Sequence, residues 1–249
     1  MSIEINEPQR WGMFGTILWS IFIATSFVFI QVFVTAVYIG NVYGEDAVID
    51  SARFDHYMME VQYNGTVISL STISTAILCS VLVLLAIKLK KGATLKDHLG
   101  FTHVDMKTSV SWLIVIAVFI ICSDLLTISM GRPIVPDFMT SVYNSIEAVW
   151  LLWLALVIAA PLFEELFVRG FIYSGLSASV LGPVGAILIT SLFWAVVHSQ
   201  YDSYEIATIF FMGLILGTAR WKTGSVLLTM GLHSIINLVA TIETVIHVS

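Results

Sequence analysis

The chain alternates between long apolar runs and short polar segments. The apolar runs lie at about 13–39, 66–88, 109–130, 147–169, 184–200, 206–220 and 225–246. A helix needs roughly 20 apolar residues to cross the hydrocarbon core of a bilayer, so these runs are predicted to be membrane spans. The pattern therefore predicts an all-α fold, a polytopic bundle of about seven to eight transmembrane helices.

The composition agrees with a membrane protein. Hydrophobic residues make up 58% of the chain, charged residues only 11%, and the mean hydropathy is +0.94, which exceeds what a soluble domain hides in its core. The first run is too long for a signal-peptide core and lacks a clear cleavage site, so we expect it to remain as the first span. Cys79 and Cys122 lie in different runs and are interpreted as packing residues, not as a disulfide or a zinc cluster.

The basic residues predict how the chain is oriented. Most fall at alternate ends of the runs: Arg10, Lys88, Lys90, Lys91, Lys96, Lys107, Arg169, Arg220 and Lys222. Basic residues in short loops stay on the cytoplasmic side, so this set places the amino terminus in the cytoplasm and the carboxyl terminus outside. Only Arg53 and Arg132 fall on the other side, where the acidic loop 40–65 accounts for most of the net charge of −6. We expect a multi-pass protein of a bacterial or archaeal cell membrane, in contact with lipid and without a nucleic-acid partner.

The charged residues inside the runs are concentrated in one segment. Glu164, Glu165 and Arg169 lie close together in an apolar context, and a charged side chain near the bilayer centre costs roughly 2.5–3.5 kcal/mol. Glu165 and Arg169 are four positions apart and can pair on one helix face, which fits a structural role as well as a functional one. Glu164 is rotated by roughly 100° from Glu165 and has no basic partner nearby in sequence. Glu164 is therefore the stronger candidate for chemistry.

Two further polar pairs have helical spacing. Trp194 and His198 share one helix face at the end of an apolar run, and His233 and Asn237 lie one turn apart in the last run. Taken singly, each histidine also fits an interfacial or carbonyl-bonded role, and Asn237 alone is typical of helix–helix contacts. Together with Glu164, however, they are the residue types that activate water and hold an oxyanion. Their joint occurrence favours a hydrolytic site.

Three motifs therefore occur in order inside apolar runs: Glu164-Glu165-x-x-x-Arg169, Trp194-x-x-x-His198 and His233-x-x-x-Asn237. Together they resemble the motifs of the CAAX prenyl protease and bacteriocin-processing (CPBP) family of intramembrane endopeptidases. The resemblance covers roughly residues 145–240, whereas the first 140 residues resemble no family that we can name. We expect one membrane domain over 1–249, with spans of unknown role in 1–140 and a catalytic core in 145–240.

The resemblance implies a role for each matching residue. Glu164 is implied as the general base on water, with His198 as its partner, and His233 with Asn237 as stabilisers of the tetrahedral oxyanion. Glu165, Arg169 and Trp194 are implied as supporting residues. The implied substrate is a protein or peptide, prenylated for the eukaryotic members of the family. Whether the substrate of this chain carries a prenyl group is left open.

The implied site requires a hairpin. Seven straight spans would place Glu164 and His198 near opposite faces of the membrane. The conflict disappears if one helix extends from about 147 to 181 and the chain turns at Gly182-Pro183, because proline is well suited to begin the next helix. At roughly 1.5 Å per residue, Glu164, His198 and His233 then reach similar depths. We expect this long helix to project into the cytoplasm, and substrate to enter from the cytoplasmic half of the bilayer.

The motifs leave the catalytic type open. Glu164, His198 and His233 are able to ligate zinc, although a His-Glu-x-x-His motif is absent. Water activated by Glu164 and His198 without metal, as in a glutamic protease, is preferred because the family motif supplies Asn237 as a donor and not as a further strong ligand. The expected cofactor is therefore none, with zinc as the alternative.

Two other functional classes are considered. A non-catalytic scaffold or bacteriocin-immunity protein would retain the polar cluster for stability, and a transporter would use a buried carboxylate relay. The transporter is less favoured because the charges concentrate at one site and do not mark a path across the membrane. Gly213 and Gly217 form a small-x-x-x-small face that predicts a close helix contact, either within one bundle or between chains.

Overall fold

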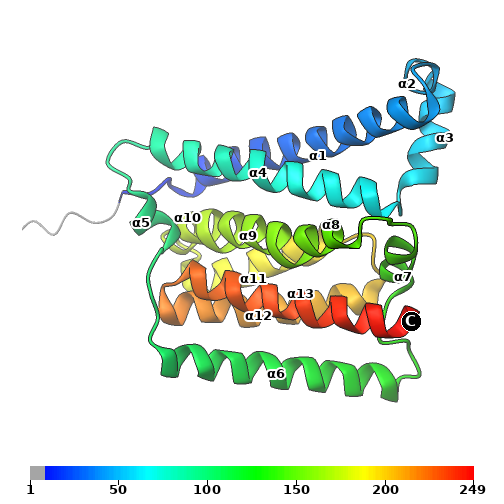
Figure 1. Cartoon of the computed structure of the whole chain (residues 1–249). Coiled ribbons are helices and arrows are strands. Elements are labelled where there is room, and N and C mark those ends of the chain that lie inside the picture. Colours follow the sequence, from blue (N-terminus) through cyan, green and yellow to red (C-terminus); the bar gives the residue numbers. More distant parts are fainter. Residues whose placement is uncertain (1–8) are drawn as a thin grey trace, which may run out of the picture.

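The computed structural model describes residues 9–249, and every regular element in that range is a helix (Figure 1). This confirms the predicted all-α bundle. In chain order the elements are α1 (Met13–Tyr43), α2 (Asp46–Ile49), α3 (Ser51–Val61), α4 (Gly65–Leu89), α5 (Leu95–Leu99), α6 (Met106–Ser129), α7 (Asp137–Asn144), α8 (Val149–Trp153), η1 (Leu154–Ala159), α9 (Ala160–Glu165), η2 (Leu166–Ile172), α10 (Tyr173–Ser177), α11 (Gly182–Val196), α12 (Ser203–Thr223) and α13 (Val226–Val248).

Each predicted apolar run falls on a helix, but the helices differ in how well they suit a membrane span. Within the described residues, five have the length and apolar character to cross a bilayer: α1, α4, α6, the continuous helix Val149–Ser177 and α13. The protein is therefore an integral membrane protein. The predicted spans at 184–200 and 206–220 correspond to α11, which is short, and to α12, which falls outside that group of five.

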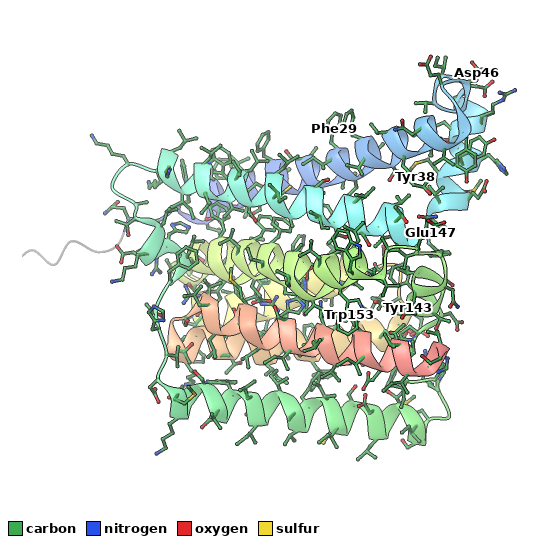
Figure 2. All side chains as sticks on the ribbon, viewed as in Figure 1. Phe29, Tyr38, Asp46, Tyr143, Glu147 and Trp153 are labelled. Carbon is green, nitrogen blue, oxygen red and sulfur yellow. The ribbon has the colours of Figure 1, made fainter. Side chains whose placement is uncertain are left out.

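The helix Val149–Ser177 lies inside the bundle. Helices α1 and α4 pair along one edge and α6 lies at the opposite edge, with α11, α12 and α13 between α6 and the central helix (Figure 1). Large apolar side chains project from the outer helices, as for Phe29 on α1, whose exposed fraction is 69% (Figure 2). These outward side chains suit a lipid environment, in which apolar surface carries no cost.

The two ends of the bundle differ in charge. One end, called the basic end, contains the start of α1, the end of α4, α5, the start of α6 and the turn between α12 and α13. Its basic residues are Arg10, Lys88, Lys90, Lys91, Lys96, Lys107, Arg220 and Lys222. The opposite end carries α2, α3 and α7, with the acidic residues Glu45, Asp46, Asp50, Asp55, Glu60 and Asp137. This separation is the one that the sequence predicts for Lys and Arg in short loops.

The basic end is closed by two glycine turns. Gly100 ends α5 and Gly224 ends α12, both with a left-handed backbone (φ 69° and 68°) that glycine adopts without steric cost. The amide of Val226 donates to the carbonyl of Gly100 at 3.0 Å, so the start of α13 is fixed against α5. A side chain on Gly100 would collide with the Gly224 carbonyl and the Arg220 guanidinium. The connection therefore depends on glycine at this position.

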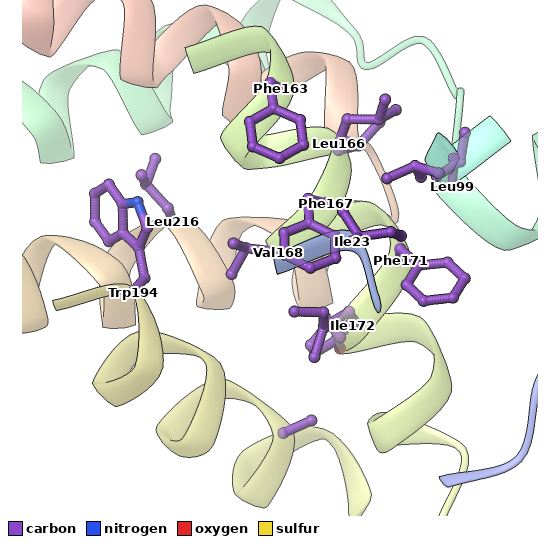
Figure 3. Close-up of a cluster of buried hydrophobic side chains, with 14 of the residues drawn as sticks. Ile23, Leu99, Phe163, Leu166, Phe167, Val168, Phe171, Ile172, Trp194 and Leu216 are labelled. Atoms are coloured by element: carbon purple, nitrogen blue, oxygen red, sulfur yellow. The ribbon is translucent and has the colours of Figure 1, made fainter. Parts of the chain in front are cut away.

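One apolar cluster joins the amino-terminal helices to the rest of the bundle. Ile23 of α1, Val83 of α4 and Ile116 of α6 are each fully buried in the same cluster as Phe171 and Leu216. Figure 3 shows part of this cluster around the central helix. Residues 1–140 therefore supply packing surface to the helices that carry the three motifs, at least over the part that the structure describes.

The glycine face predicted on α12 packs within the chain. A Cβ atom on Gly213 would lie 2.9 Å from the Ser191 Cβ, and one on Gly217 would lie 3.0 Å from a methyl group of Ile187. Both contacts are with α11, so the small residues allow α11 and α12 to approach closely. Of the two predicted alternatives, a contact within one bundle therefore accounts for the Gly213 and Gly217 face.

The predicted hairpin forms, but its first helix is shorter than expected. The central helix ends at Ser177 instead of 181, and α11 begins at Gly182, which has φ 60°. Arg169 lies well inside this helix and is 1% exposed, so its assignment to the end of a span is wrong. The ion pair with the buried Glu165 allows the charge of Arg169 to lie inside the helix, so the helix continues past it.

Candidate active site

The central helix is irregular on both sides of the two glutamates. Leu154–Ala159 and Leu166–Ile172 are π-helical, with backbone hydrogen bonds that span five residues, and Pro161 lies between them. Proline lacks an N–H and cannot continue the ladder. The π-pattern pairs the Ala160 amide with the Ala155 carbonyl. The next carbonyl in that register, that of Leu156, is therefore opposite Pro161, which has no N–H to donate. Such π-segments are frequent at functional sites.

Asn237 supplies the donor that Pro161 lacks. Its Nδ2 donates to the Leu156 carbonyl at 2.8 Å, from α13 to the central helix. A buried carbonyl without a donor is costly, so this bond explains why an amide side chain is placed here. An asparagine amide has two N–H groups, and the carbonyl engages one of them. Asn237 therefore holds the two helices in register and keeps a second donor.

Three charged or polar side chains form a group that is closed to solvent. Glu165 accepts hydrogen bonds from Arg169 Nη1 at 2.9 Å and His233 Nδ1 at 3.1 Å, both at its Oε1 atom. The three residues are at most 2% exposed. Arg169 also donates to the Gly213 carbonyl at 3.4 Å. We call Glu165, Arg169 and His233 the closed cluster. The predicted i, i+4 pair is confirmed, and its carboxylate also fixes the ring of His233.

Trp194 separates the closed cluster from Glu164. Its Nε1–H donates to Glu164 Oε2 at 2.6 Å. The guanidinium of Arg169 lies 4.4 Å from the centroid of the Trp194 ring. Its ring also meets those of His198 and His233 edge-on, at centroid distances of 5.2 and 5.1 Å. The residue assigned a supporting role thus contacts Glu164, Arg169 and both histidines of the motifs.

His198 presents one ring nitrogen for chemistry. Its Nδ1 lies 2.7 Å from the Trp194 carbonyl oxygen. Because a carbonyl only accepts, Nδ1 is the donor, and the neutral ring carries its lone pair on Nε2. The residue follows the last turn of α11 and is partly exposed. His198 is thereby prepared to accept a proton on its cavity side.

These residues line a large cavity. It has a volume of about 890 Å³, and its walls include Glu164, Trp194, His198, His233 and Asn237. The structure therefore brings together all four residues predicted to be catalytic, as the hairpin required. Glu165 and Arg169 lie behind this wall, consistent with their assignment as supporting residues.

The cavity extends away from the basic end. From the motif residues it extends to the segment 133–139, to Met58 and Gln62 beside α3, and to Gln200 and Tyr201 after α11. All of these lie at the end opposite the basic residues. With a cytoplasmic basic end, as the charges predict, this part of the cavity lies toward the outer half of the membrane. Entry of substrate from the cytoplasmic half stays a prediction.

Tyr201 is a cavity residue that the motifs did not indicate. It lies in the segment between α11 and α12, and its ring stacks at 6.4 Å from that of His198. Burial raises the pKa of the Tyr201 phenol above its ordinary value, and the charges of Glu164 and Glu205 add to the effect. The phenol stays protonated at neutral pH and is available as a donor. Its spacing of three from His198 is the only signal in the sequence.

The three residues named for the zinc alternative line one cavity. Trp194 donates to Glu164, and the Nδ1 atoms of His198 and His233 are bonded to a carbonyl and a carboxylate, which leaves Nε2 as the metal-binding atom of each ring. Across residues 9–249, no group of three His, Cys, Asp or Glu side chains is placed to hold a metal ion. The metal-free and the zinc alternatives both stay predictions.

Comparisons with known proteins agree with the motifs. Residues 146–239 match the family described as Rce1-like, type II CAAX prenyl endopeptidase. This confirms the resemblance over the part of the chain that carries the motifs, and at the level of the family it supports a CAAX-type intramembrane protease. An Escherichia coli protein described as an uncharacterized 24.3 kDa protein is 37% identical over 130 residues. That match spans 50% of this chain and 59% of the relative. No solved structure matches the chain.

Proposed function

We propose that the protein is an intramembrane endopeptidase that cleaves a membrane-associated or lipidated protein or peptide. The observation that carries the proposal is the shared position of Glu164 and His198 on the wall of one cavity, with Trp194 in contact with both. The match of residues 146–239 to the Rce1-like family supports the reaction class. Whether the substrate carries a prenyl group is a separate question.

In the proposed reaction Glu164 takes a proton from water while the water oxygen attacks the scissile carbonyl carbon. Trp194 holds the Glu164 carboxylate in place, and Nε2 of His198 is positioned to share the transferred proton. The tetrahedral oxyanion then lies near the second N–H of Asn237 and near His233. Because Nδ1–H of His233 is held by Glu165, this ring donates to the oxyanion in its doubly protonated form. When the C–N bond breaks, the proton passes to the leaving amine, so water is divided between a new carboxyl and a new amino terminus.

The closed cluster has a positioning role in this scheme. Glu165 fixes the Nδ1 side of His233 and turns the other ring nitrogen toward the cavity. Arg169 balances the charge of Glu165 and lies over Trp194. In a low-dielectric interior these fixed dipoles cost little to reorganise as charge develops. We assign activation of water to these side chains without a metal. Stoichiometric zinc in the purified protein, with activity lost to a chelator, would reverse that choice.

The basic end is proposed to face the cytoplasm, so the cavity opens in the outer half of the membrane. The test is cysteine labelling in a Cys122→Ala background, because Cys122 is exposed and Cys79 is buried. A membrane-impermeant maleimide added to intact cells should label Asp55→Cys at the opposite end and spare Lys91→Cys until the cells are permeabilised. The reverse pattern would move the entrance to the cytoplasmic side.

Terminal-amine proteomics tests the activity itself. Membranes are compared from cells that express the native protein or Glu164→Gln at matched levels. New protein termini that depend on Glu164 are expected, and they identify the substrates. Identical termini, with both proteins folded and present, would favour a scaffold or immunity role.

A further inference from the structure

The cavity carries charge of one sign. The described residues that line it include four carboxylates, each from a different helix, and no Lys or Arg: Asp124 of α6, Glu164 of α9, Glu205 of α12 and Glu243 of α13. A cleft with walls of low dielectric and one sign of charge concentrates its field on whatever enters. The lining therefore offers carboxylates, and no Lys or Arg, to a ligand.

Two of these carboxylates have no partner in the protein. Asp124 and Glu243 make no hydrogen bond or ion pair with any residue in the range 9–249. They line the same cavity from α6 and α13, two helices that pack together. Both lie within membrane-spanning helices, where an ionisable side chain usually has a partner or a function. Glu205 differs, because Arg132 donates to it at 2.9 Å. The unpaired carboxylates thus face the cavity alone.

The distance from Glu243 to the motif residues on α13 defines where a charged group of a ligand would bind. Glu243 lies six positions beyond Asn237 and ten beyond His233 on α13, which corresponds to about 9 and 15 Å along the helix. An extended peptide covers about 3.3 Å per residue, so this is a span of roughly three to five residues.

We propose that the cavity selects substrates with a Lys or Arg about three to five residues from the scissile bond, held between Asp124 and Glu243. The inference rests on the proposed protease activity and specifies its substrate class. A cation of this kind supplies the partner that both carboxylates lack. A free carboxyl terminus at the same distance would instead face four carboxylates with no Lys or Arg on the wall. Cleavage inside a chain next to a basic segment is thus favoured over trimming close to a terminal carboxylate.

The experiment compares cleavage sites in membranes from cells that express one of four forms at matched levels. These are the native protein, Glu164→Gln, the double variant Asp124→Asn/Glu243→Gln, and the control Asp46→Asn/Asp55→Asn. The control removes the same charge from exposed positions on α2 and α3, outside the cavity. Sequences around Glu164-dependent termini are then aligned on the cut.

We expect Lys or Arg to be enriched in the window three to five residues from the cut for the native protein and the control. The double variant should keep Glu164-dependent cleavage but lose the enrichment. For one identified site, made as a peptide, replacing the basic residue with Glu should lower kcat/KM at least tenfold in the native protein and less than threefold in the double variant. Termini without enrichment, or enrichment that survives in the double variant, would overturn the charge selection and leave the protease proposal standing. The absence of Glu164-dependent termini would remove the protease proposal, and this inference with it.

Discussion

Two adjacent glutamates lie in very different surroundings. Glu165 belongs to the closed cluster, where Arg169 and His233 use its Oε1 atom and water has no access. Glu164, one residue earlier, lies on the cavity wall with a single indole donor. A helical rotation of roughly 100° separates the two environments. The comparison teaches that Glu165 serves to position its neighbours, whereas Glu164 on the cavity wall is free to exchange protons.

The largest expected effect is on the cavity side. Glu164→Gln should lower kcat/KM by about 10²–10⁴, the usual contribution of a general base. The amide oxygen still accepts from Trp194, so the free energy of unfolding should change by less than about 1 kcal/mol. The measurements are cleavage of an identified substrate and thermal unfolding in detergent. A variant that keeps full activity would contradict the role of Glu164 as base.

In the closed cluster, substitution should mainly lower the free energy of unfolding. Glu165→Ala leaves the guanidinium of Arg169 buried without its carboxylate, which should destabilise the protein by about 3–5 kcal/mol. Thermal unfolding and the yield of folded protein measure the loss.

A double variant serves as the control for that prediction. Glu165→Leu/Arg169→Met removes both charges and should recover much of the stability, because a buried pair replaced by apolar side chains is often close to neutral. If Glu165→Ala unfolds at the same temperature as the native protein, the closed cluster does not stabilise the fold.

A smaller change tests the residue between the two sides. Trp194→Phe keeps an aromatic ring near Arg169 but removes the N–H that holds Glu164. A hydrogen bond to a charged group contributes about 1.5–3 kcal/mol, so kcat should fall by roughly 10- to 100-fold with little change in KM. Trp221→Phe, at an exposed position of α12, is the matched control. An equal loss in both variants, or a change in KM alone, would argue against a positioning role.

The smallest effect, expressed per pH unit, concerns a buried histidine at the basic end that does not line the cavity. His98 of α5 is fully buried, neither ring nitrogen has a partner within the described chain, and its ring stacks on Phe171. Burial, with the charges of Arg10 and Arg220, lowers the pKa of His98 to about 4. The unfolded chain has a pKa near 6.5 and takes up a proton first on acidification, so stability is lost as the pH falls from about 6.5 to 4.

The slope in that window should be at most about 1.4 kcal/mol per pH unit from this one residue. Thermal unfolding between pH 7 and pH 4 measures it, with His98→Phe as the test variant and His103→Gln, at an exposed position, as the control. His98→Phe should flatten the dependence and His103→Gln should leave it unchanged. An unchanged slope in His98→Phe would show that other groups set the acid sensitivity.

Local patterns predicted the helices and one side-chain pair. Helical spacing is sufficient to pair Glu165 with Arg169. The family motifs select Glu164, His198, His233 and Asn237, which line one cavity, and their catalytic roles stay predictions. The partners across helices did not follow, because they depend on rotation and depth. The Trp194–Glu164 bond and the Asn237–Leu156 bond each join segments far apart in the chain. Pro161 was a usable signal for the second bond, since a missing N–H inside a helix implies a donor from elsewhere.

The bond from Asn237 to the Leu156 carbonyl also restricts how the protein can move. If α13 slid along the central helix, that carbonyl would lose the amide donor that holds the two helices in register. The same side of the bundle is further tied by His233 to Glu165. Admission of a bulky substrate should therefore displace other walls of the cavity, namely α6 or the α1–α4 pair, while the two helices that carry the acid and amide groups remain in register.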